Sequence, residues 1–220
     1  MPAEPLALTL LRAAAGRNTL SARQLREEQI RWVLDLGLGA LLHGLIDGEI
    51  ERLPGAAAPL VEGAEMTARF RQGLLCDAAS EILDQSPALR GPVTLIKGIS
   101  IAEQHYPPHG TTCDIDLRRL PAELAACEDG MRALGYLPEV SDRPDSFYET
   151  HHHSRPFHHP LTGVRVEAHT ALFPPRTGLT DGGPFAAAHV ASQLRPGDYH
   201  GRPVRRLSNE LQLLFLAAHW

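Results

Sequence analysis

The sequence lacks several features that would place it in other classes of protein. It has three cysteines, Cys76, Cys113 and Cys127, whose wide spacing matches neither a disulfide framework nor a zinc motif. This cysteine usage fits a reducing compartment, so we expect a cytoplasmic protein. No basic segment followed by an apolar run opens the chain, so no signal peptide is expected. No apolar stretch reaches about 18 residues, so no membrane span is expected either.

Positive charge is also in short supply. The chain has 21 lysines and arginines against 26 aspartates and glutamates, which gives a formal net charge of −5. A general nucleic-acid surface needs an excess of basic residues. The composition therefore argues against such a surface, although a local basic patch stays possible. Hydrophobic residues make up 43% of the chain, which is enough for a packed core and argues against global disorder.

The spacing of apolar residues, prolines and glycines divides the chain into three parts. Residues 1–90 carry apolar side chains at helical intervals, which predicts a helical N-terminal region. Residues 91–175 contain short apolar and alternating runs, which predict the strands of a β-sheet core. Residues 176–220 read as a loop followed by the start of a C-terminal helical region near Ser208. Together these patterns predict an α+β fold with a small mixed β-sheet.

Two short segments place acidic residues on one face of a strand. Cys113–Leu117 alternates, so Asp114 and Asp116 point the same way, and Glu167 lies on the polar face of Val164–Ala171. Two neighbouring carboxylates repel each other unless a cation lies between them. Carboxylates are ligands that Mg²⁺ accepts together with substrate phosphates. Asp-x-Asp alone is common on exposed strands, but with a third acid it predicts a metal site for phosphoryl or nucleotidyl transfer.

The residues that follow the buried strand Val93–Ile96 could bind phosphate. Glycine allows backbone N–H groups to approach a phosphate closely, and the start of a helix favours negative charge. We therefore expect Lys97, Gly98 and Ser100 to contact substrate, although Lys-Gly alone is more often an ordinary turn. His169 shares the polar strand face with the third acid and is also expected to contact substrate.

In combination these motifs resemble the uncharacterised nucleotidyltransferase family of the polymerase-beta-type superfamily. The resemblance covers about residues 91–173 and rests on Lys97-Gly98, Asp114-Ile115-Asp116, Gly135-Tyr136 and Glu167-Ala168-His169. It implies transfer of a nucleoside monophosphate from an NTP such as ATP to an unidentified acceptor hydroxyl on a protein, an RNA or a small molecule. It implies that Asp114 and Asp116 hold two Mg²⁺ ions and that Glu167 completes the second site and assists deprotonation. Gly98 and Ser100 would contact the β- and γ-phosphates.

Two other functions stay open. The spacing of Gly98-Ile99-Ser100 departs from the adjacent Gly-Ser of the superfamily, which favours a degenerate nucleotide-binding module, although all three acids are retained. Half of the 12 histidines lie between His151 and His169, which favours a zinc or iron hydrolase. The segment Phe147–His153 reads as a strand. Consecutive residues on a strand alternate faces, so at most His151 and His153 are expected on one side.

The C-terminal helix presents an apolar stripe that needs a partner. Leu211, Leu214, Phe215 and Ala218 share one side of the helix, and the chain ends at Trp220 without a stop signal. An apolar helix face must be buried against something. We therefore expect either a truncated chain, or packing against the N-terminal helices, or an oligomer formed through this helix.

Overall fold

The computed structural model describes residues 6–14, 16, 20–46, 48–85, 92–105 and 112–219. The described residues form two compact units, one up to Gly73 and the other from Leu74 onward. The domain boundary expected at position 91 lies outside the described residues, as does Trp220. None of the described helices combines the length and the apolar composition that crossing a membrane requires.

The first unit is helical, as its periodic apolar pattern predicts. Apolar side chains from every helix meet in one core, in which Ile30, Val33 and Leu42 are almost completely buried. Glu27 and Glu28 lie in the first turn of α2, where negative charge interacts favourably with the helix dipole and stabilises the helix. The elements that contribute are α1 (Leu6–Ala14), η1 (Ala22–Gln24), α2 (Glu27–Asp35), α3 (Gly39–Ile46), η2 (Ile50–Arg52) and the first part of α4 (Ala57–Asp84).

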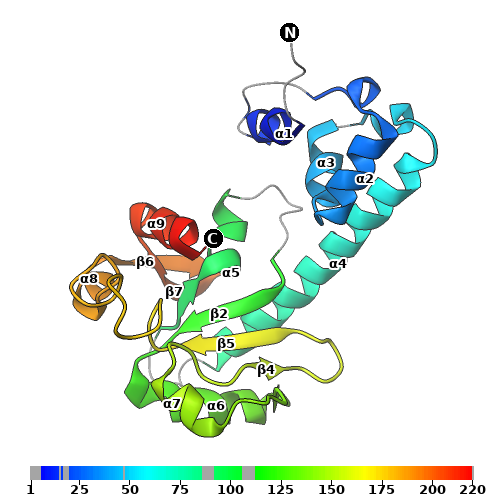
Figure 1. Ribbon diagram of the computed structural model, residues 1–220. Helices are drawn as coiled ribbons and strands as arrows, with labels where there is room; N and C mark the ends of the chain where they lie inside the picture. The colour runs from blue at the N-terminus through cyan, green and yellow to red at the C-terminus, as the bar shows by residue number, and fades with distance from the viewer. Residues whose placement is uncertain are drawn as a thin grey trace. The chain divides into compact units, whose positions relative to one another are not determined.

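The second unit contains a mixed sheet of seven strands, which confirms the predicted α+β class (Figure 1). The strand order is β3-β4-β5-β2-β1-β7-β6, with β2 parallel to β5 and antiparallel to β1. The strands are β1 (Thr94–Ile96), β2 (Asp114–Arg118), β3 (Leu137–Pro138), β4 (Phe157–His158), β5 (Arg165–His169), β6 (Leu194–Tyr199) and β7 (Arg202–Leu207). The helices are α5 (Lys97–His105), η3 (Pro121–Glu123), α6 (Leu124–Ala133), α7 (Asp145–Thr150), α8 (Ala187–Ser192) and α9 (Asn209–His219).

One face of the sheet is apolar and forms the main core of this unit. Ile115 and Leu117 pair in register with Val166 and Ala168, and all four are buried in one cluster. The second part of α4 and the helix α6 contribute the apolar side chains that complete it, among them Ile82. Because strand residues alternate, the other face of β2 and β5 carries the polar residues, as the alternation in the sequence predicts.

The C-terminal helix packs against β1 and β7 on the face of the sheet that carries the acids. Leu211 and Phe215 are buried in a cluster with Ile96 of β1 and with residues of the segment 172–190. Leu214 is instead 51% exposed. Residues of the second unit cover Leu211 and Phe215, and not the N-terminal helices, which were one of the three alternatives expected for this stripe.

Two segments differ from the secondary structure that the sequence predicts. Residues 145–150 form the helix α7 and not part of a strand, since the pattern from Phe147 onward also fits one helical turn. The segment 176–207, expected to be a loop, contains α8, β6 and β7. Gly197 lies within β6 and Pro203 within β7. Because glycine and proline normally indicate a loop, the sequence pattern did not predict this β-hairpin.

Candidate active site

The parallel pairing of β2 and β5 brings the acidic residues together. Asp116 pairs in register with Glu167, and Asp114 pairs with Arg165. Side chains directly across a pair of strands point to the same face. The three carboxylates therefore lie on one face of two adjacent strands, although 51 positions separate Asp116 from Glu167 in the sequence.

Asp116 is the most enclosed of the three acids, with an exposed fraction of 0%. Its Oδ1 accepts a hydrogen bond from Lys97 Nζ at 2.8 Å and another from His169 Nε2 at 2.8 Å. An ionised carboxylate only accepts, so His169 carries its proton on Nε2. The second oxygen of Asp116, Oδ2, is buried and has no hydrogen-bond partner among the described residues. A buried carboxylate oxygen of this kind is poised for a cation.

Glu167 lies against three cationic or protonated groups. Its carboxylate is 2.6 Å from Arg165 Nη1, 3.3 Å from His169 Nε2 and 3.6 Å from Lys97 Nζ. Burial by itself would raise the pKa of Glu167, but the hydrogen bond from His169 and the charges of Arg165 and Lys97 lower it well below the ordinary value. Glu167 is therefore ionised at neutral pH and is a weak base.

Asp114 has the opposite electrostatic environment. Burial, and after it the negative charges of Asp116 and Glu167, raise the pKa of Asp114 from 3.8 to about 6. The charges of Lys97 and Arg165 offset only part of this increase, and the Nη1 of Arg165 lies 3.8 Å from Asp114 Oδ2. A carboxylate with a raised pKa near two others is a sign that the cluster holds more negative charge than the protein neutralises.

The residues present fit a divalent cation. Single ligand atoms of Asp116, Glu167 and His169 all lie within 4.8 Å of one another. Carboxylate oxygens suit Mg²⁺, whereas the imidazole is a softer ligand. The unpartnered oxygen of Asp116 and the raised pKa of Asp114 both indicate that additional positive charge would stabilise the cluster.

The predicted phosphate-contacting segment lies partly in this cluster. Lys97 reaches two of the acids and adopts φ 53°, in the left-handed region that costs a non-glycine residue on the order of 1 kcal/mol. A Cβ built on Gly98 would lie 2.0 Å from Thr112 Oγ1, so only glycine fits there. Ser100 is 2% exposed, and its carbonyl accepts a hydrogen bond from Arg206. Packing explains both residues without a phosphate, so their contact with substrate stays a prediction.

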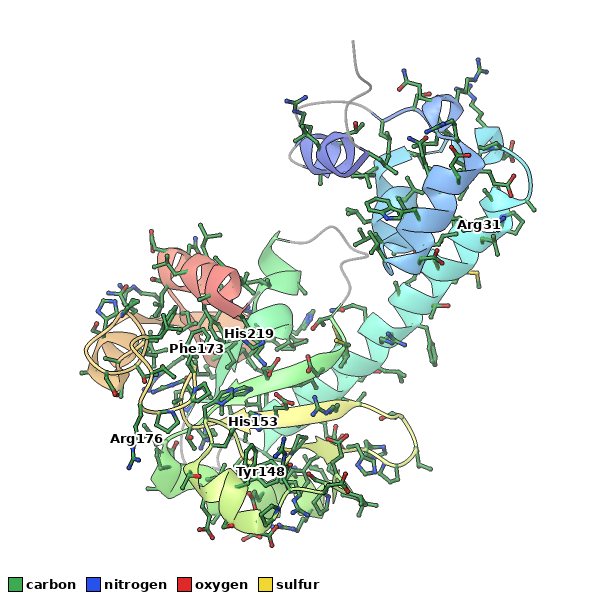
Figure 2. All side chains as sticks on the ribbon, in the orientation of Figure 1. Arg31, Tyr148, His153, Phe173, Arg176 and His219 are labelled. Atoms are coloured by element: carbon green, nitrogen blue, oxygen red, sulfur yellow. The ribbon has the colours of Figure 1, made fainter. Side chains whose placement is uncertain are left out.

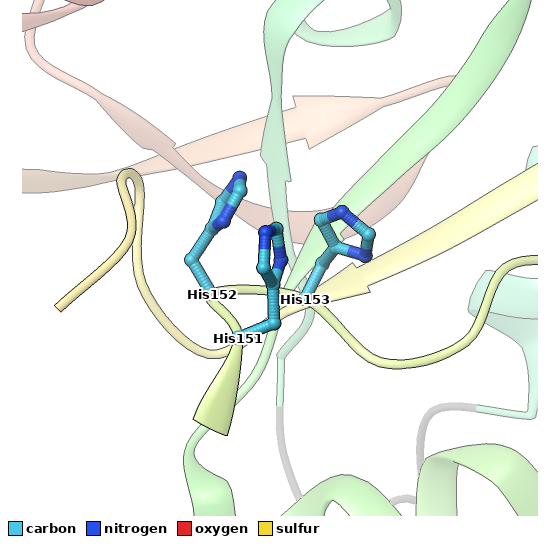
Figure 3. A group of neighbouring side chains, drawn as sticks. All are labelled: His151, His152 and His153. Carbon is cyan, nitrogen blue, oxygen red and sulfur yellow. The ribbon is translucent and has the colours of Figure 1, made fainter. Parts of the chain in front are cut away.

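Three consecutive histidines, His151, His152 and His153, converge (Figure 3). One ring nitrogen from each of His151, His152 and His153 lies within 4.8 Å of the others. The prediction that at most His151 and His153 share a side is wrong, because these residues follow the end of α7 at Thr150 and do not form a regular strand. The rings of His152 and His153 lie 5.6 and 5.4 Å from the ring of His169, measured between centroids.

Two of these histidines, His151 and His152, are held in a neutral form that can bind a metal. Burial, followed by the neighbouring imidazoles, lowers the pKa of His152 to about 3 and also lowers the pKa of His151. The Nδ1 of His153 donates to the carbonyl of Ser154 at 2.7 Å, which leaves its Nε2 as a lone-pair donor. The other members of the histidine-rich segment are not part of the group. The Nδ1 of His159 accepts backbone N–H groups at 3.3 Å in a turn.

Two residues near the acids had no role in the sequence-based prediction. Arg165 joins Glu167, Asp114 and Glu139, the last at 3.3 Å. Arg165 stands two residues before Glu167, so the alternation of a strand places both side chains on one face. This spacing could have identified Arg165 from the sequence. His219 lies at the end of α9 beside Phe173, as Figure 2 shows. Burial, and after it the charge of Lys97, lowers its pKa.

Comparison with known proteins identifies a family for this arrangement. A family model described as an uncharacterised nucleotidyltransferase matches residues 23–220 of the chain, which confirms the resemblance found in the sequence motifs. No curated protein matches the chain, and no solved structure matches it. The family supports nucleotidyl transfer as the general activity.

Proposed function

The chain belongs to a family of uncharacterised nucleotidyltransferases, and from this premise we propose that it transfers a nucleoside monophosphate from an NTP to an acceptor hydroxyl. Mg²⁺ is the proposed cofactor, and ATP is one possible donor. The observation that supports the proposal best is the pairing of Asp116 with Glu167 beside Asp114, with one buried oxygen of Asp116 left without a hydrogen bond. The three scattered cysteines support a cytoplasmic location for this activity.

Asp114, Asp116 and Glu167 would hold two Mg²⁺ ions. Mg²⁺ held by these residues would neutralise the charge of the phosphates and make the acceptor hydroxyl more acidic. His169 acts as a positioning residue, because its Nε2 contacts both Asp116 and Glu167 and fixes the orientation of the two carboxylates.

Lys97 and Arg165 supply the fixed positive charge of the site. Their cationic groups lie 3.6 and 2.6 Å from the carboxylate of Glu167, and neither side chain is completely buried. Cations held beside the acids would stabilise the negative charge that develops on the phosphates during transfer. This electrostatic role needs no covalent intermediate on the protein.

The proposed reaction forms one bond and breaks another. The acceptor oxygen bonds to the α-phosphorus, the bond from that phosphorus to the pyrophosphate oxygen breaks, and the hydroxyl proton moves to a base. The family resemblance implies that Glu167 assists this deprotonation.

The test compares Asp116→Asn with the exposed control Asp129→Asn. The first change removes the central charge at almost constant volume, whereas Asp129 forms an ion pair with Arg132 on the exposed surface of α6. We expect each MgNTP that raises the melting temperature of the wild type to do so in Asp129→Asn and not in Asp116→Asn. Labelled NTP incubated with cell extract should transfer its label only with wild type and the control. Equal shifts in all three proteins for every NTP would refute the proposal, and binding without transfer would indicate the degenerate module.

A metal-dependent hydrolase is a second candidate function, because the structure brings His151, His152 and His153 together. Neutral imidazoles favour Zn²⁺ or Fe²⁺ over Mg²⁺. Elemental analysis of the purified protein separates the two candidates. The hydrolase is supported if the protein contains stoichiometric zinc or iron that His152→Ala loses, and if it hydrolyses a phosphate ester or an amide. Magnesium-dependent NTP binding without tightly bound transition metal supports nucleotidyl transfer.

A further inference from the structure

A second cluster of charge lies on the same face of the sheet as the acids, two residues further along β2. Arg118 pairs in register with His169 on one side and with Thr94 on the other. With a rise of about 3.3 Å per residue, its Cα lies about 7 Å from that of Asp116. The proposed chemistry at the acids makes no use of this arginine.

Arg118 is buried without a counter-ion. Its exposed fraction is 8%, its Nε has no hydrogen-bond partner, and no carboxylate in the described part of the chain forms an ion pair with it. A buried cation without a partner destabilises a folded protein, so its presence indicates a ligand that supplies the missing negative charge.

The side chain of Arg118 lines a cavity of about 890 Å³. A volume of this size is in the range of pockets that bind small molecules. Four arginines and one acidic residue contribute charge to its wall: Arg118, Arg119, Arg195, Arg205 and Glu123. The cavity therefore carries an excess of three positive charges, in a protein whose net charge is −5.

The other arginines of the cavity differ in how they are held. Arg119 lies 3.6 Å from Glu123, and Arg195 donates to the backbone carbonyls of Ser192 and Leu194. Arg205 lies on an exposed position of β7. Arg118 is therefore both the most deeply placed cation without a carboxylate partner and the one that a bound anion would stabilise most.

We propose that this cavity binds a phosphate group of a substrate. Guanidinium groups match the geometry of phosphate oxygens and can bind them through paired hydrogen bonds. Several cations around one space suit the multiple charge of a phosphate better than a single carboxylate. The identification of the ligand as a substrate rests on the proposed function, whereas the affinity of the cavity for phosphate does not. The phosphate belongs either to the acceptor or to the tail of the NTP.

The primary experiment measures binding of inorganic phosphate and pyrophosphate by calorimetry, with EDTA present to remove metals. We expect Arg118→Met to weaken pyrophosphate binding by about tenfold or more, because a hydrogen-bonded charge is lost. The exposed control Arg143→Met should change the affinity by less than about twofold. Arg118→Met should also melt at or above the temperature of the phosphate-free wild type, because methionine fills the space without a buried charge. A purely structural arginine would instead show a lower melting temperature and unchanged affinity.

Additional variants and a competition experiment distinguish the remaining explanations. If Arg118→Met does not fold, Arg205→Met carries the binding test, since Arg205 is exposed and its loss should leave the core intact. Asp116→Asn should bind pyrophosphate as tightly as the wild type does. NTP binding by Asp116→Asn therefore tests the proposed function, whereas phosphate binding by Arg118→Met tests the cavity. Competition between MgNTP and pyrophosphate assigns the cavity to the NTP tail, and simultaneous binding assigns it to a phosphorylated acceptor. Absence of phosphate binding in the wild type, or unchanged binding in both arginine variants, would overturn the proposal.

Discussion

Removing the charge of Asp114 should stabilise the metal-free protein. Burial and the neighbouring acids raise the pKa of this carboxyl from 3.8 to about 6. At roughly 1.4 kcal/mol per pH unit, the difference corresponds to about 3 kcal/mol of unfavourable free energy when Asp114 is ionised in the folded state. The side chain is 23% exposed, so solvent screening reduces the expected gain of Asp114→Asn to about 1–2 kcal/mol.

The sign of the effect depends on pH. A carboxyl whose pKa is raised by folding is protonated in both states below about pH 4, so the variant and the wild type should then be equally stable. Between pH 4 and 6 the wild type loses stability as the unfolded state ionises first. Above about pH 6 the difference reaches its full value and stays constant. Mg²⁺ should reverse the order, because only the wild type retains the complete set of carboxylates.

Thermal or urea unfolding at pH 4 and pH 8, each in EDTA and in Mg²⁺, measures this prediction. A gain of 1–2 kcal/mol corresponds to an increase in melting temperature of about 3–6 °C for a protein of this size. Asp129→Asn, on the surface of α6, is the control and should change the stability by less than about 0.5 kcal/mol. If Asp114→Asn is less stable than wild type in EDTA at pH 8, or if its effect is the same at both pH values, the electrostatic account of the cluster is wrong.

Two further predictions concern packing. Gly98→Ala should destabilise the protein by about 1–3 kcal/mol in urea unfolding, because the new Cβ would lie 2.0 Å from Thr112 Oγ1 and 2.7 Å from Thr112 Cβ. The double variant Gly98→Ala with Thr112→Gly should recover part of this loss, and an additive effect would contradict the steric explanation. Phe215→Ala should cost about 3–5 kcal/mol because the ring is completely buried, whereas Leu214→Ala should cost less than about 1 kcal/mol. Similar losses for both would indicate that Leu214 is covered in solution by a second copy of the chain.

Local patterns in the sequence were sufficient for part of the fold and of the candidate site. The alternation around Asp114 and Asp116, and around Glu167, predicts which side chains point away from the core, because the period of a strand is a property of the backbone alone. The same holds for the helical N-terminal region, whose apolar spacing is periodic. Secondary structure was missed where glycine and proline lie inside strands, as in β6 and β7.

The pairing of strands that are remote in the sequence determined the rest of the fold and of the candidate site. The contact of Asp116 with Glu167 requires β2 and β5 to be adjacent, parallel and in one register, and no local pattern contains that information. The convergence of three consecutive histidines depends on where α7 ends. The isolation of Arg118 from any described acid depends on which strands flank it. The sequence by itself determined which residues are polar on each strand. The tertiary structure decided which of those residues neutralise each other and which are left for a ligand. The reason is that electrostatic energy depends on distances between residues that are remote in the chain.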